Sequence, residues 1–391
     1  MTAHADAFDL IDQSADELVE LSHAIHARPE LAFEERFASG LLADALDDRG
    51  LRVERRAYDL ETAFVAHVGA GDGPNVAVCL EYDALPDIGH ACGHNVIATA
   101  GLGAAIALAG VVEECGGRLT ILGTPAEERG GGKILLAERG ALEGVDAAMM
   151  VHPAGNDFLA PEMLAMMQLD VRAHGREAHA AGFPWRGANA LDAIVLGYMG
   201  VAALRQHIHP TERVHGIITR GGAAPNIVPN LAAARFNIRS SSLERLEPLQ
   251  ARVLACFEGG AAQAGCRLEH RFVGPYADLV TNTALASVYQ RHAEGLGREF
   301  LPPDAVRMPA VGSTDMGNVS RLVPSIHPMV AIAPSGVPLH TAEFATHAVS
   351  EAADRAIVDS AKALAATAID LWQDASLMSA VAAEFAGRSR P

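Results

Sequence analysis

Residues 89–95 read Gly-His-Ala-Cys-Gly-His-Asn, and the segments on either side of this stretch indicate the fold. Before it, residues 75–80 form a short apolar run that predicts a buried strand. After it, residues 96–109 are small and apolar, which predicts a buried helix. Open α/β sheets place their functional groups in loops that join a strand end to a helix start. The sequence therefore predicts an α/β fold with its chemistry in this loop.

Cys92 and His94 form a candidate pair of metal ligands. Residues two apart on an extended segment point the same way, so both side chains could reach one ion. An isolated Cys-x-His pair is more often a buried thiol beside a structural histidine. The start of a helix, however, favours the thiolate form that binds metal.

The next two predicted strands also lead into polar side chains. Residues 118–123 run into Glu128, and residues 146–151 end at His152. Candidate ligands thus follow the carboxyl ends of three successive strands. Unrelated core residues would not be expected to recur at these positions. The pattern favours a metal site at this edge of the sheet.

Glu127 and Glu128 are adjacent carboxylates after the second of these strands. On an extended segment, neighbouring side chains point in opposite directions. We therefore expect the two carboxylates to have different roles: one binds metal and the other holds a water.

Composition excludes some partners and suggests a compartment. The formal net charge of −18 argues against a nucleic-acid partner, which would require concentrated Lys and Arg. Residues 95–112 come nearest to a membrane span, but they are rich in Ala and Gly, and we expect no membrane partner. The N-terminus lacks the features of a signal peptide. A cytoplasmic, reducing location is expected because the cysteines are odd in number and scattered: Cys79, Cys92, Cys115, Cys256 and Cys266.

The middle of the chain predicts a second domain. Its expected elements follow the order β-α-β-β-α-β, which is typical of a split-βαβ, ferredoxin-like unit. We place this inserted domain at residues 164–274, and the larger domain at residues 1–163 and 275–391. The expected elements of the insert are residues 166–173, 188–206, 213–220, 233–239, 243–264 and 267–273.

Several motifs together resemble one family. The chain is similar over nearly its whole length to the M20 metallopeptidases and amidohydrolases, within the branch that includes aminoacylase-1-like protein 2 and aminobenzoyl-glutamate hydrolases. The resemblance implies a zinc-peptidase-like α/β catalytic domain interrupted by a lid domain through which members commonly form homodimers. The matching stretches are Glu81-Tyr-Asp-Ala-Leu-Pro86, residues 89–95, Gly123-Thr-Pro-Ala-Glu-Glu128, the following Gly-Gly-Gly-Lys133, and Ser313-Thr-Asp-Met-Gly-Asn-Val-Ser320.

The resemblance also implies two divalent metal ions per chain. Thiolate and imidazole ligands favour Zn²⁺, while a carboxylate ligand also permits Mn²⁺. His90 and His327 do not match ligand positions, so each is either structural or a support for a ligand. The ligands carried over by the resemblance are Cys92, His94, Glu128, His152 and His340.

The resemblance further assigns catalytic and substrate-binding roles. Glu127 would be the general base, and Asp83 would orient a metal ligand. In the inserted domain, His179 would stabilise the oxyanion, usually in the site of the partner protomer. Asn226 and Arg239 would bind polar groups of the substrate, and Arg239 suits a bidentate grip on a carboxylate.

These features predict a metal-dependent hydrolase that cleaves the amide bond of a small N-acyl amino acid or dipeptide by attack of water. One alternative is an enzyme in which Cys92 is the nucleophile and a histidine is its base. Another is a binding or regulatory protein that keeps the fold without turnover. The residues do not decide which acyl group or amino acid is recognised.

Overall fold

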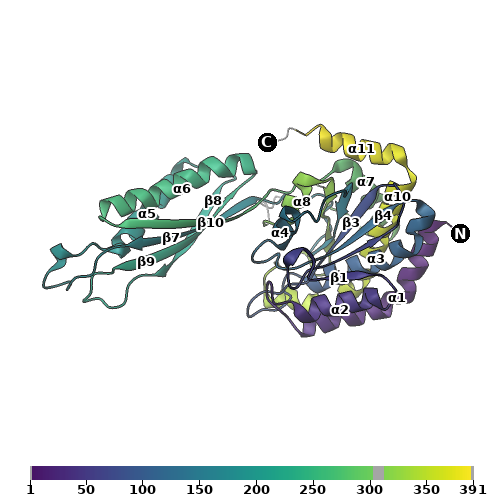
Figure 1. Cartoon of the computed structure of the whole chain (residues 1–391), viewed down its shortest axis with the longest axis horizontal. Coiled ribbons are helices and arrows are strands. Elements are labelled where there is room, and N and C mark those ends of the chain that lie inside the picture. The colour runs from purple at the N-terminus through teal and green to yellow at the C-terminus, as the bar shows by residue number, and fades with distance from the viewer. Residues whose placement is uncertain (1, 303–311, 389–391) are drawn as a thin grey trace. The chain divides into compact units, whose positions relative to one another are not determined.

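The computed structural model describes residues 2–302 and 312–388, which form two compact units (Figure 1). The larger unit contains the described residues up to Glu162, those from Leu279 to Pro302, and those from Thr314 onward. The smaller unit contains Met163–Asp278 together with Gly312 and Ser313. The smaller unit is therefore an insertion in the sequence of the larger one.

A six-stranded sheet forms the centre of the larger unit, with the strand order β1-β2-β4-β3-β5-β11. The strands β4, β3, β5 and β11 run parallel, and β1 and β2 form an antiparallel edge. Every residue of β3 is buried, as expected for a parallel strand covered on both faces. The strands are β1 Val53–Arg55, β2 Phe64–Val68, β3 Asn75–Glu81, β4 Arg118–Thr124, β5 Ala147–Met149 and β11 Ser325–Ile326.

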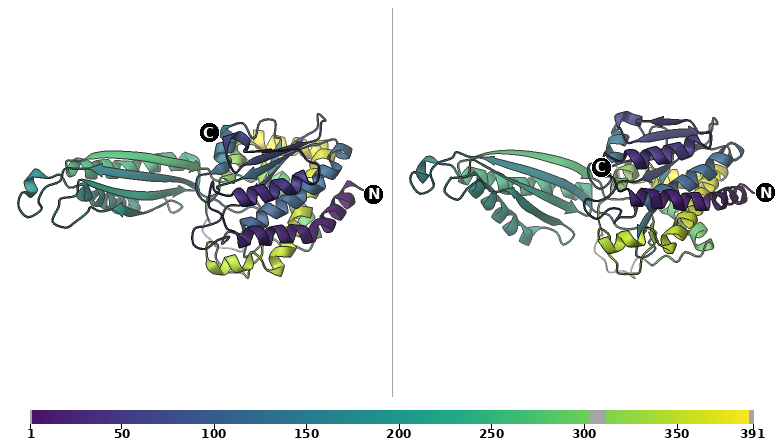
Figure 2. Two further views of the ribbon diagram at one scale, coloured as in Figure 1. Left: turned by 60° about the horizontal axis from the view of Figure 1, so that its bottom comes forward. Right: turned by 90° about the horizontal axis from the view of Figure 1, so that it is seen from below.

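Helices cover both faces of this sheet (Figure 1 and Figure 2). Val76, Val78 and Leu80 of β3 pack into a core with α1 (Ala3–Ala27), α3 (His94–Cys115) and α10 (Glu351–Gln373). Ala77 and Cys79 face a second core that includes residues of α4 (Gly132–Glu138) and α8 (Met316–Leu322). The period of two along a strand thus divides β3 between two hydrophobic layers. The helices are α1 Ala3–Ala27, α2 Arg36–Asp47, α3 His94–Cys115, α4 Gly132–Glu138, α7 Thr283–Gly295, α8 Met316–Leu322, α9 Ala342–His347, α10 Glu351–Gln373 and α11 Ala375–Ala386.

The helix α3 is the most apolar long helix of the larger unit. By length and composition alone it could cross a membrane, but 89% of its most hydropathic stretch is buried inside the protein. It packs between β3, α1 and α10. The apolar run after residue 95 therefore forms the central helix of the core.

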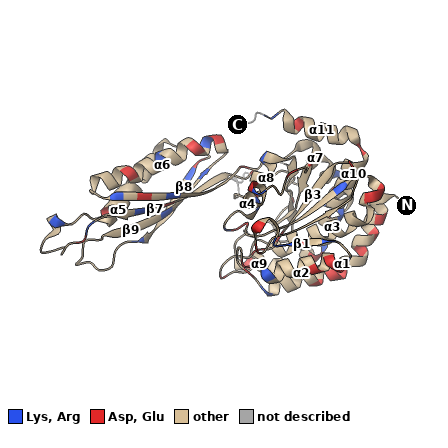
Figure 3. Ribbon diagram, viewed as in Figure 1, with Lys and Arg blue, Asp and Glu red and all other residues tan. Residues whose placement is uncertain are grey.

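Acidic residues are conspicuous on α1 and α2 (Figure 3). The helix α1 contains no Lys or Arg, and its neighbour α2 contains only Arg36. This surface would repel a polyanion. The acidic residues of α1 are Asp6, Asp9, Asp12, Asp16, Glu17 and Glu20.

The smaller unit is a four-stranded antiparallel sheet in the order β10-β7-β9-β8 with two helices. Buried and partly buried residues alternate along β9, because α5 and α6 cover one face of the sheet. The element order confirms the predicted ferredoxin-like insert. Its elements are β7 Ala165–His174, α5 Ala190–Leu204, β8 Arg213–Arg220, β9 Leu231–Ser240, α6 Leu243–Gln263 and β10 Arg267–Tyr276, with 3-10 turns at Pro184–Arg186 and Arg205–His207.

The structure divides the units a few residues away from the predicted boundary. The strand β10 continues past residue 274 because Tyr276 still pairs with Met166, which keeps the segment up to Asp278 in the smaller unit. Gly312 joins this unit because its carbonyl accepts a hydrogen bond from Leu164 N at 2.8 Å. Sequence periodicity could not show this return contact, because the contacting residues are far apart in the chain.

Candidate metal centre

The five predicted metal ligands of the larger unit converge at one edge of the sheet. Cys92 Sγ lies 3.4 Å from Nε2 of His152 and 3.4 Å from Nε2 of His340. The backbone N–H of His340 donates to Ala91 O at 2.9 Å, which fixes this distant loop beside the cysteine. The convergence follows from topology, because β3, β4 and β5 are parallel neighbours and end at the same edge.

The ligand atoms form two groups that share the Cys92 thiol. One group is Cys92, His94 and His152, the other is Cys92, Glu128 and His340, and the atoms within each group lie within 4.8 Å of one another. Around one ion, sulfur at about 2.3 Å and nitrogen at about 2.1 Å would lie roughly 3.5 Å apart at a tetrahedral angle. These residues could therefore hold two divalent ions, with Cys92 belonging to both ligand groups.

Buried atoms without hydrogen bonds support this fit. His94 Nε2 and Glu128 Oε1 are buried and make no hydrogen bond, although they lie 3.8 Å apart. Leaving buried polar atoms unsatisfied costs about 1–3 kcal/mol each. A cation between them would satisfy both.

The backbone between Cys92 and His94 differs from the predicted extended segment. Cys92 lies in a turn, Gly93 adopts a left-handed conformation with φ of 78°, and His94 is the first residue of α3. A Cβ at position 93 would lie 2.8 Å from Cγ of Pro153. Glycine is therefore needed both for the turn and for the close approach of the loop that carries His152.

The prediction of an extended conformation for Glu127 and Glu128 is also wrong. Both residues lie in a turn after β4, preceded by Ala126 with φ of 61°. Glu127 groups with Glu81 and His94, whereas Glu128 groups with the ligands around Cys92. The turn, and not strand alternation, gives the two carboxylates different neighbours.

His152 also departs from its predicted place at the end of the third strand. It begins a separate strand, β6 His152–Ala154, which pairs in parallel with β12 Met329–Ala331. Its Nδ1 donates to Pro153 O at 2.8 Å, so its Nε2 is the atom that faces Cys92. This hydrogen bond selects the tautomer that can bind metal.

Asp83 connects two of the candidate ligands. One of its oxygens accepts a hydrogen bond from His94 Nδ1 at 3.0 Å, and the other accepts from Glu128 N at 2.9 Å. Asp83 is buried, so this geometry is rigid. It orients the imidazole so that Nε2 faces the candidate ions, as expected for a residue that supports a ligand.

Burial controls the charge of Cys92 and the two glutamates. Burial, with the Glu128 carboxylate nearby, raises the pKa of the Cys92 thiol well above its usual range, despite its place just before a helix. Burial and the neighbouring Glu81 and Glu128 likewise raise the pKa of Glu127. Although burial opposes ionisation of Glu128, the His340 ring, whose Nε2 lies 3.3 Å from Oε1, and the charge of His94 hold its pKa at about 2. Divalent ions would compensate the negative charge of this site.

Sequence reasoning missed a buried ion network beside these residues. Lys133 Nζ contacts Glu81 Oε2 and lies 2.7 Å from Asp315 Oδ1. The backbone N–H of Lys133 also donates to Asp315 Oδ2 at 2.8 Å. All three side chains are buried. All three residues lie in the motifs that carry the family resemblance, and that was the signal in the sequence. The sequence could not show that they pair, because they lie far apart in the chain.

His90 and His327 lie near the site without joining either ligand group. The His327 ring packs edge-on against His152 with centroids 5.3 Å apart, and His90 packs against His26 at 6.0 Å. Burial lowers the pKa of His90 to about 3 and that of His327 well below the usual value. Both are therefore neutral packing partners.

Glu35 links the stability of the metal-free protein to pH. Its carboxylate accepts hydrogen bonds from Thr62 Oγ1 at 2.8 Å and from Ala126 N at 2.9 Å. Burial, reinforced by the Asp83 carboxylate, raises the pKa of Glu35 from 4.5 to about 7. The folded state thus binds this proton more tightly than the unfolded state. The resulting stabilisation is complete below pH 4.5 and is lost as the pH rises through about 7.

We therefore expect Glu35→Gln to reduce the pH dependence of stability. Between about pH 5 and about pH 8, chelator-treated wild type should lose up to about 3 kcal/mol of unfolding free energy that the variant retains, because one pKa unit corresponds to about 1.4 kcal/mol. Urea unfolding of both proteins at the two pH values measures this difference. Equal losses in wild type and variant would contradict the role assigned to Glu35.

The predicted residues of the smaller unit lie at two ends of its sheet. His179 Nδ1 accepts hydrogen bonds from the backbone N–H groups of Ala181 and Gly182, at 3.3 and 3.0 Å, so its proton lies on Nε2. Asn226 is adjacent, because its carbonyl accepts from Ala180 N at 3.0 Å. Arg239 lies at the far end of β9, where it donates to Ser313 Oγ at 3.0 Å.

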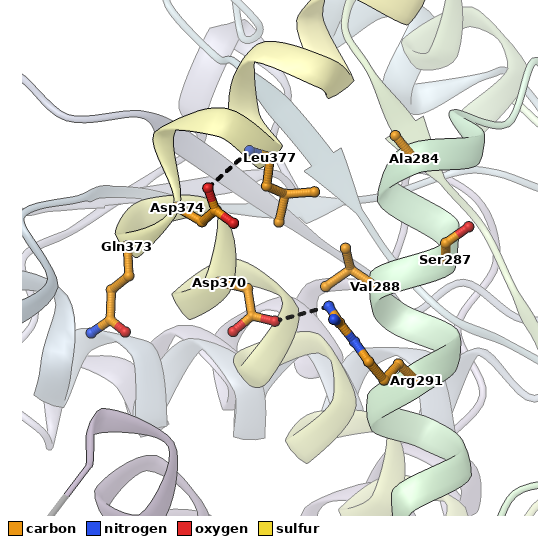
Figure 4. Close-up of a pocket in the computed structure, with 8 residues that line it drawn as sticks. All are labelled: Ala284, Ser287, Val288, Arg291, Asp370, Gln373, Asp374 and Leu377. Atoms are coloured by element: carbon orange, nitrogen blue, oxygen red, sulfur yellow. Dashed lines mark hydrogen bonds and ion pairs between the residues drawn. The ribbon is translucent and has the colours of Figure 1, made fainter.

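A surface groove elsewhere in the larger unit contains none of these residues. It measures about 580 Å³ and lies between α7, α10 and α11 (Figure 4). Its polar groups partly satisfy each other, with Arg291 3.4 Å from Asp370. We therefore assign the chemistry to the sheet edge. The groove is lined by Ala284, Ser287, Val288, Arg291, Asp370, Gln373, Asp374 and Leu377.

Comparison with known proteins identifies the family. Residues 165–264 match the family described as the peptidase dimerisation domain. The chain is 39% identical to the Xaa-Arg dipeptidase of Mus musculus, covering 97% of this chain and 91% of that protein. It is 29% identical to a p-aminobenzoyl-glutamate hydrolase polypeptide of Escherichia coli, with 95% and 92% of the two chains covered.

A solved structure agrees with these matches. A dinuclear metal-binding peptidase of the M20 family from Bacillus subtilis matches with a TM-score of 0.64 and 20% identity, covering 89% of this chain and 98% of that one. At this identity the similarity establishes the fold alone. Together with the longer sequence matches, it confirms the α/β catalytic domain with an inserted dimerisation domain. The chain therefore belongs to the M20 family of metallopeptidases and amidohydrolases.

Proposed function

We propose that this protein is a metal-dependent amidohydrolase that cleaves the amide bond of a dipeptide or a small N-acyl amino acid. The relatives named above are hydrolases that act on such bonds. The observation that carries the proposal is the pair of ligand groups that share Cys92, with the Glu127 carboxylate within reach of His94. This arrangement places a proton acceptor beside a site for activated water.

In the proposed reaction, Glu127 takes a proton from the attacking water and later returns it to the leaving amine. Divalent ions bound by the two groups would lower the pKa of that water and polarise the substrate carbonyl. Asp83 keeps the His94 ring in place through its hydrogen bond to Nδ1. His179, with its proton on Nε2, is suited to donate a hydrogen bond to the oxyanion.

We also propose two ions per chain, either Zn²⁺ or Mn²⁺. The thiol of Cys92 and the imidazoles favour Zn²⁺, while the carboxylate of Glu128 suits both metals. The similar peptidase from Bacillus subtilis is described as binding a dinuclear metal, which supports the number of ions. Metal analysis of the purified protein tests this assignment, and fewer than about two ions per chain after reconstitution would contradict it.

The substrate we favour is a dipeptide with a free C-terminal carboxylate and a basic C-terminal residue. The more similar of the two relatives is named for dipeptides ending in arginine, and the other for an acylated glutamate. Arg239 is half-buried and, among the residues that the structure describes, forms no ion pair with a carboxylate. Its guanidinium is therefore available for the carboxylate of a substrate.

The activity test is amine release from a panel of substrates by the metal-loaded protein. The panel should include dipeptides ending in arginine, lysine and alanine, together with N-acetyl amino acids and p-aminobenzoyl-glutamate. We expect the highest kcat/KM for the dipeptides with basic C-terminal residues. Preference for p-aminobenzoyl-glutamate would instead assign the second substrate class, and no turnover of any member would contradict the proposed activity.

Arg239→Lys should weaken recognition of the substrate carboxylate. The lysine keeps the positive charge but loses the bidentate fork, so KM should rise roughly ten- to hundredfold while kcat changes less. Arg235→Lys on the same strand is the matched control, because Arg235 is paired with Asp170 at 2.6 Å. An unchanged KM in Arg239→Lys, or an equal rise in both variants, would contradict this role.

We further propose a homodimer formed through the smaller unit. The strand β8 is an edge strand and exposes Ile217 and Ile218, while α5 exposes Val195, Leu196 and Met199. His179 and Arg239 are separated by most of the length of β9, about 25 Å at roughly 3.3 Å per residue. One chain could not hold a small substrate with both, so we assign them to one substrate from two protomers. Sedimentation should give twice the chain mass of 40.9 kDa, and a monomer would contradict the assignment.

A cytoplasmic location remains our proposal. It is supported by five free cysteines, none of which forms a disulfide in the described chain. Fractionation of the source cells tests it, and recovery of the protein outside the cytoplasm would contradict it.

A further inference from the structure

Residues 28–35, which connect α1 to α2 and are called the rim segment below, contain an aromatic residue in a strained conformation. Phe33 has a φ of 64°, in the left-handed region that bulky side chains rarely adopt. Such a conformation has an energetic cost and persists only where the surrounding structure enforces it. The Phe33 side chain is nevertheless exposed and belongs to none of the three hydrophobic cores. Burial in a core therefore does not explain why this position carries a phenylalanine.

Hydrogen bonds attach both halves of the rim segment to the loops of the metal centre. The backbone N–H of Ala84 donates to Glu30 O at 2.8 Å. Farther along the segment, the Glu35 carboxylate accepts from Ala126 N at 2.9 Å. Ala84 directly follows Asp83, and Ala126 directly precedes the two glutamates of the site. The rim segment therefore borders two of the loops that carry the functional groups.

The ring of Phe33 lies against the turn that carries Glu128. A Cβ at position 130 would overlap Cε2 of Phe33, so the ring packs directly on Gly130. Leu31 forms a parallel bridge with Ala84, which holds it beside the other loop. The side chains of Leu31 and Phe33 are both exposed at this place. The strained backbone thus holds an apolar surface next to the turn of the metal centre.

Exposed large apolar side chains are rare on the larger unit. Among the residues of this unit that the structure describes, they are Leu31, Phe33 and Leu322. Two of these three lie on the rim segment, beside the metal centre. Apolar surface next to a few convergent polar groups is typical of a ligand site.

One part of the proposed substrate still lacks a binding partner. Arg239 is assigned to the C-terminal carboxylate, and the metal centre to the scissile amide, which leaves the side chain of the N-terminal residue. Given the dipeptidase activity proposed above, on which this step depends, we infer that Leu31 and Phe33 form an apolar subsite for that side chain. The enzyme then prefers dipeptides whose N-terminal residue is apolar or aromatic.

Two substrates separate recognition of this side chain from a general effect on the site. Leucyl-arginine and glycyl-arginine share the C-terminal residue and the scissile bond, and only the first presents an N-terminal side chain. Phe33→Ala should lower kcat/KM of the metal-loaded protein about tenfold or more for leucyl-arginine, and less than about threefold for glycyl-arginine. The change should appear in KM more than in kcat, because the side chain lies away from the reacting carbonyl.

Leu322→Ala is the matched control for this experiment. Leu322 is also a large exposed apolar residue of the larger unit, but it lies at the end of α8 and outside the rim segment. We expect this variant to keep the wild-type kcat/KM for both dipeptides. Leu31→Ala should instead shift the ratio of the two values in the same direction as Phe33→Ala.

An equal fall for both dipeptides in Phe33→Ala, or an unchanged ratio of the two kcat/KM values, would overturn the subsite. If Phe33→Ala does not fold, Phe33→Gly removes the ring while glycine adopts the left-handed conformation without strain, and the same change in ratio is expected. Wild-type protein that cleaves both dipeptides equally well would contradict the subsite alone. Wild-type protein that cleaves neither would contradict the proposed hydrolase, so the two failures are distinguishable.

Discussion

Glu127→Ala should lower kcat by about 10²–10⁴-fold or more while the protein still binds both metal ions. The residue lies within 4.8 Å of His94 and outside the two groups that share Cys92, so its loss removes the proton acceptor and leaves those ligands intact. Steady-state amine release and metal analysis of the same preparation measure the two effects. The result would show that the acid–base group and the metal ligands are separate residues.

Glu128→Ala is the matched control for this experiment. It removes the adjacent carboxylate, which lies 3.3 Å from His340 Nε2 and belongs to a ligand group. We expect this variant to lose one ion together with its activity. Loss of metal from Glu127→Ala, or wild-type turnover in it, would contradict the division of roles between the two neighbours.

Cys92→Ala should have the largest effect on metal content. Both ligand groups contain the Cys92 thiol. Its removal should therefore lower the affinity for each of the two ions by about hundredfold or more and abolish turnover. Equilibrium dialysis with Zn²⁺ measures the first effect. Cys79→Ala is the control, since Cys79 is also buried, on β3, but belongs to neither ligand group.

The same variant tests the rival mechanism in which Cys92 is the nucleophile. Burial keeps the pKa of this thiol high, so without a cation it would be a poor nucleophile. A Cys92→Ala protein that retains both ions but loses turnover would favour that rival. Inactivation by thiol alkylation that a chelator does not reproduce would point the same way.

The sequence predicted the elements that follow from periodicity. The buried strand at residues 75–80, the helix after residue 95 and the element order of the insert are all present. The convergence of Cys92, Glu128 and His152 also followed from strand ends, because parallel neighbours share an edge. His340 could be added only through family resemblance, since no local pattern connects it to the other ligands.

Local backbone conformation was the main failure of sequence reasoning. The turn at Gly93 and the left-handed Ala126 depend on close contacts, such as that with Pro153, that no spacing rule contains. Lys133 is a second case, because a lysine is rarely buried unless paired. Its partners, Glu81 and Asp315, lie 52 and 182 residues away, so only the folded structure shows that this lysine belongs beside the metal centre.

The most direct test of the central claim is a metal titration of the chelator-treated protein, followed by amine release from a dipeptide with a basic C-terminal residue. The claim is that this chain hydrolyses amides by means of divalent ions held at the sheet edge. It predicts no turnover without metal, and a rise to a plateau at about two Zn²⁺ or Mn²⁺ per chain. Full turnover by protein kept metal-free with chelator would contradict the claim.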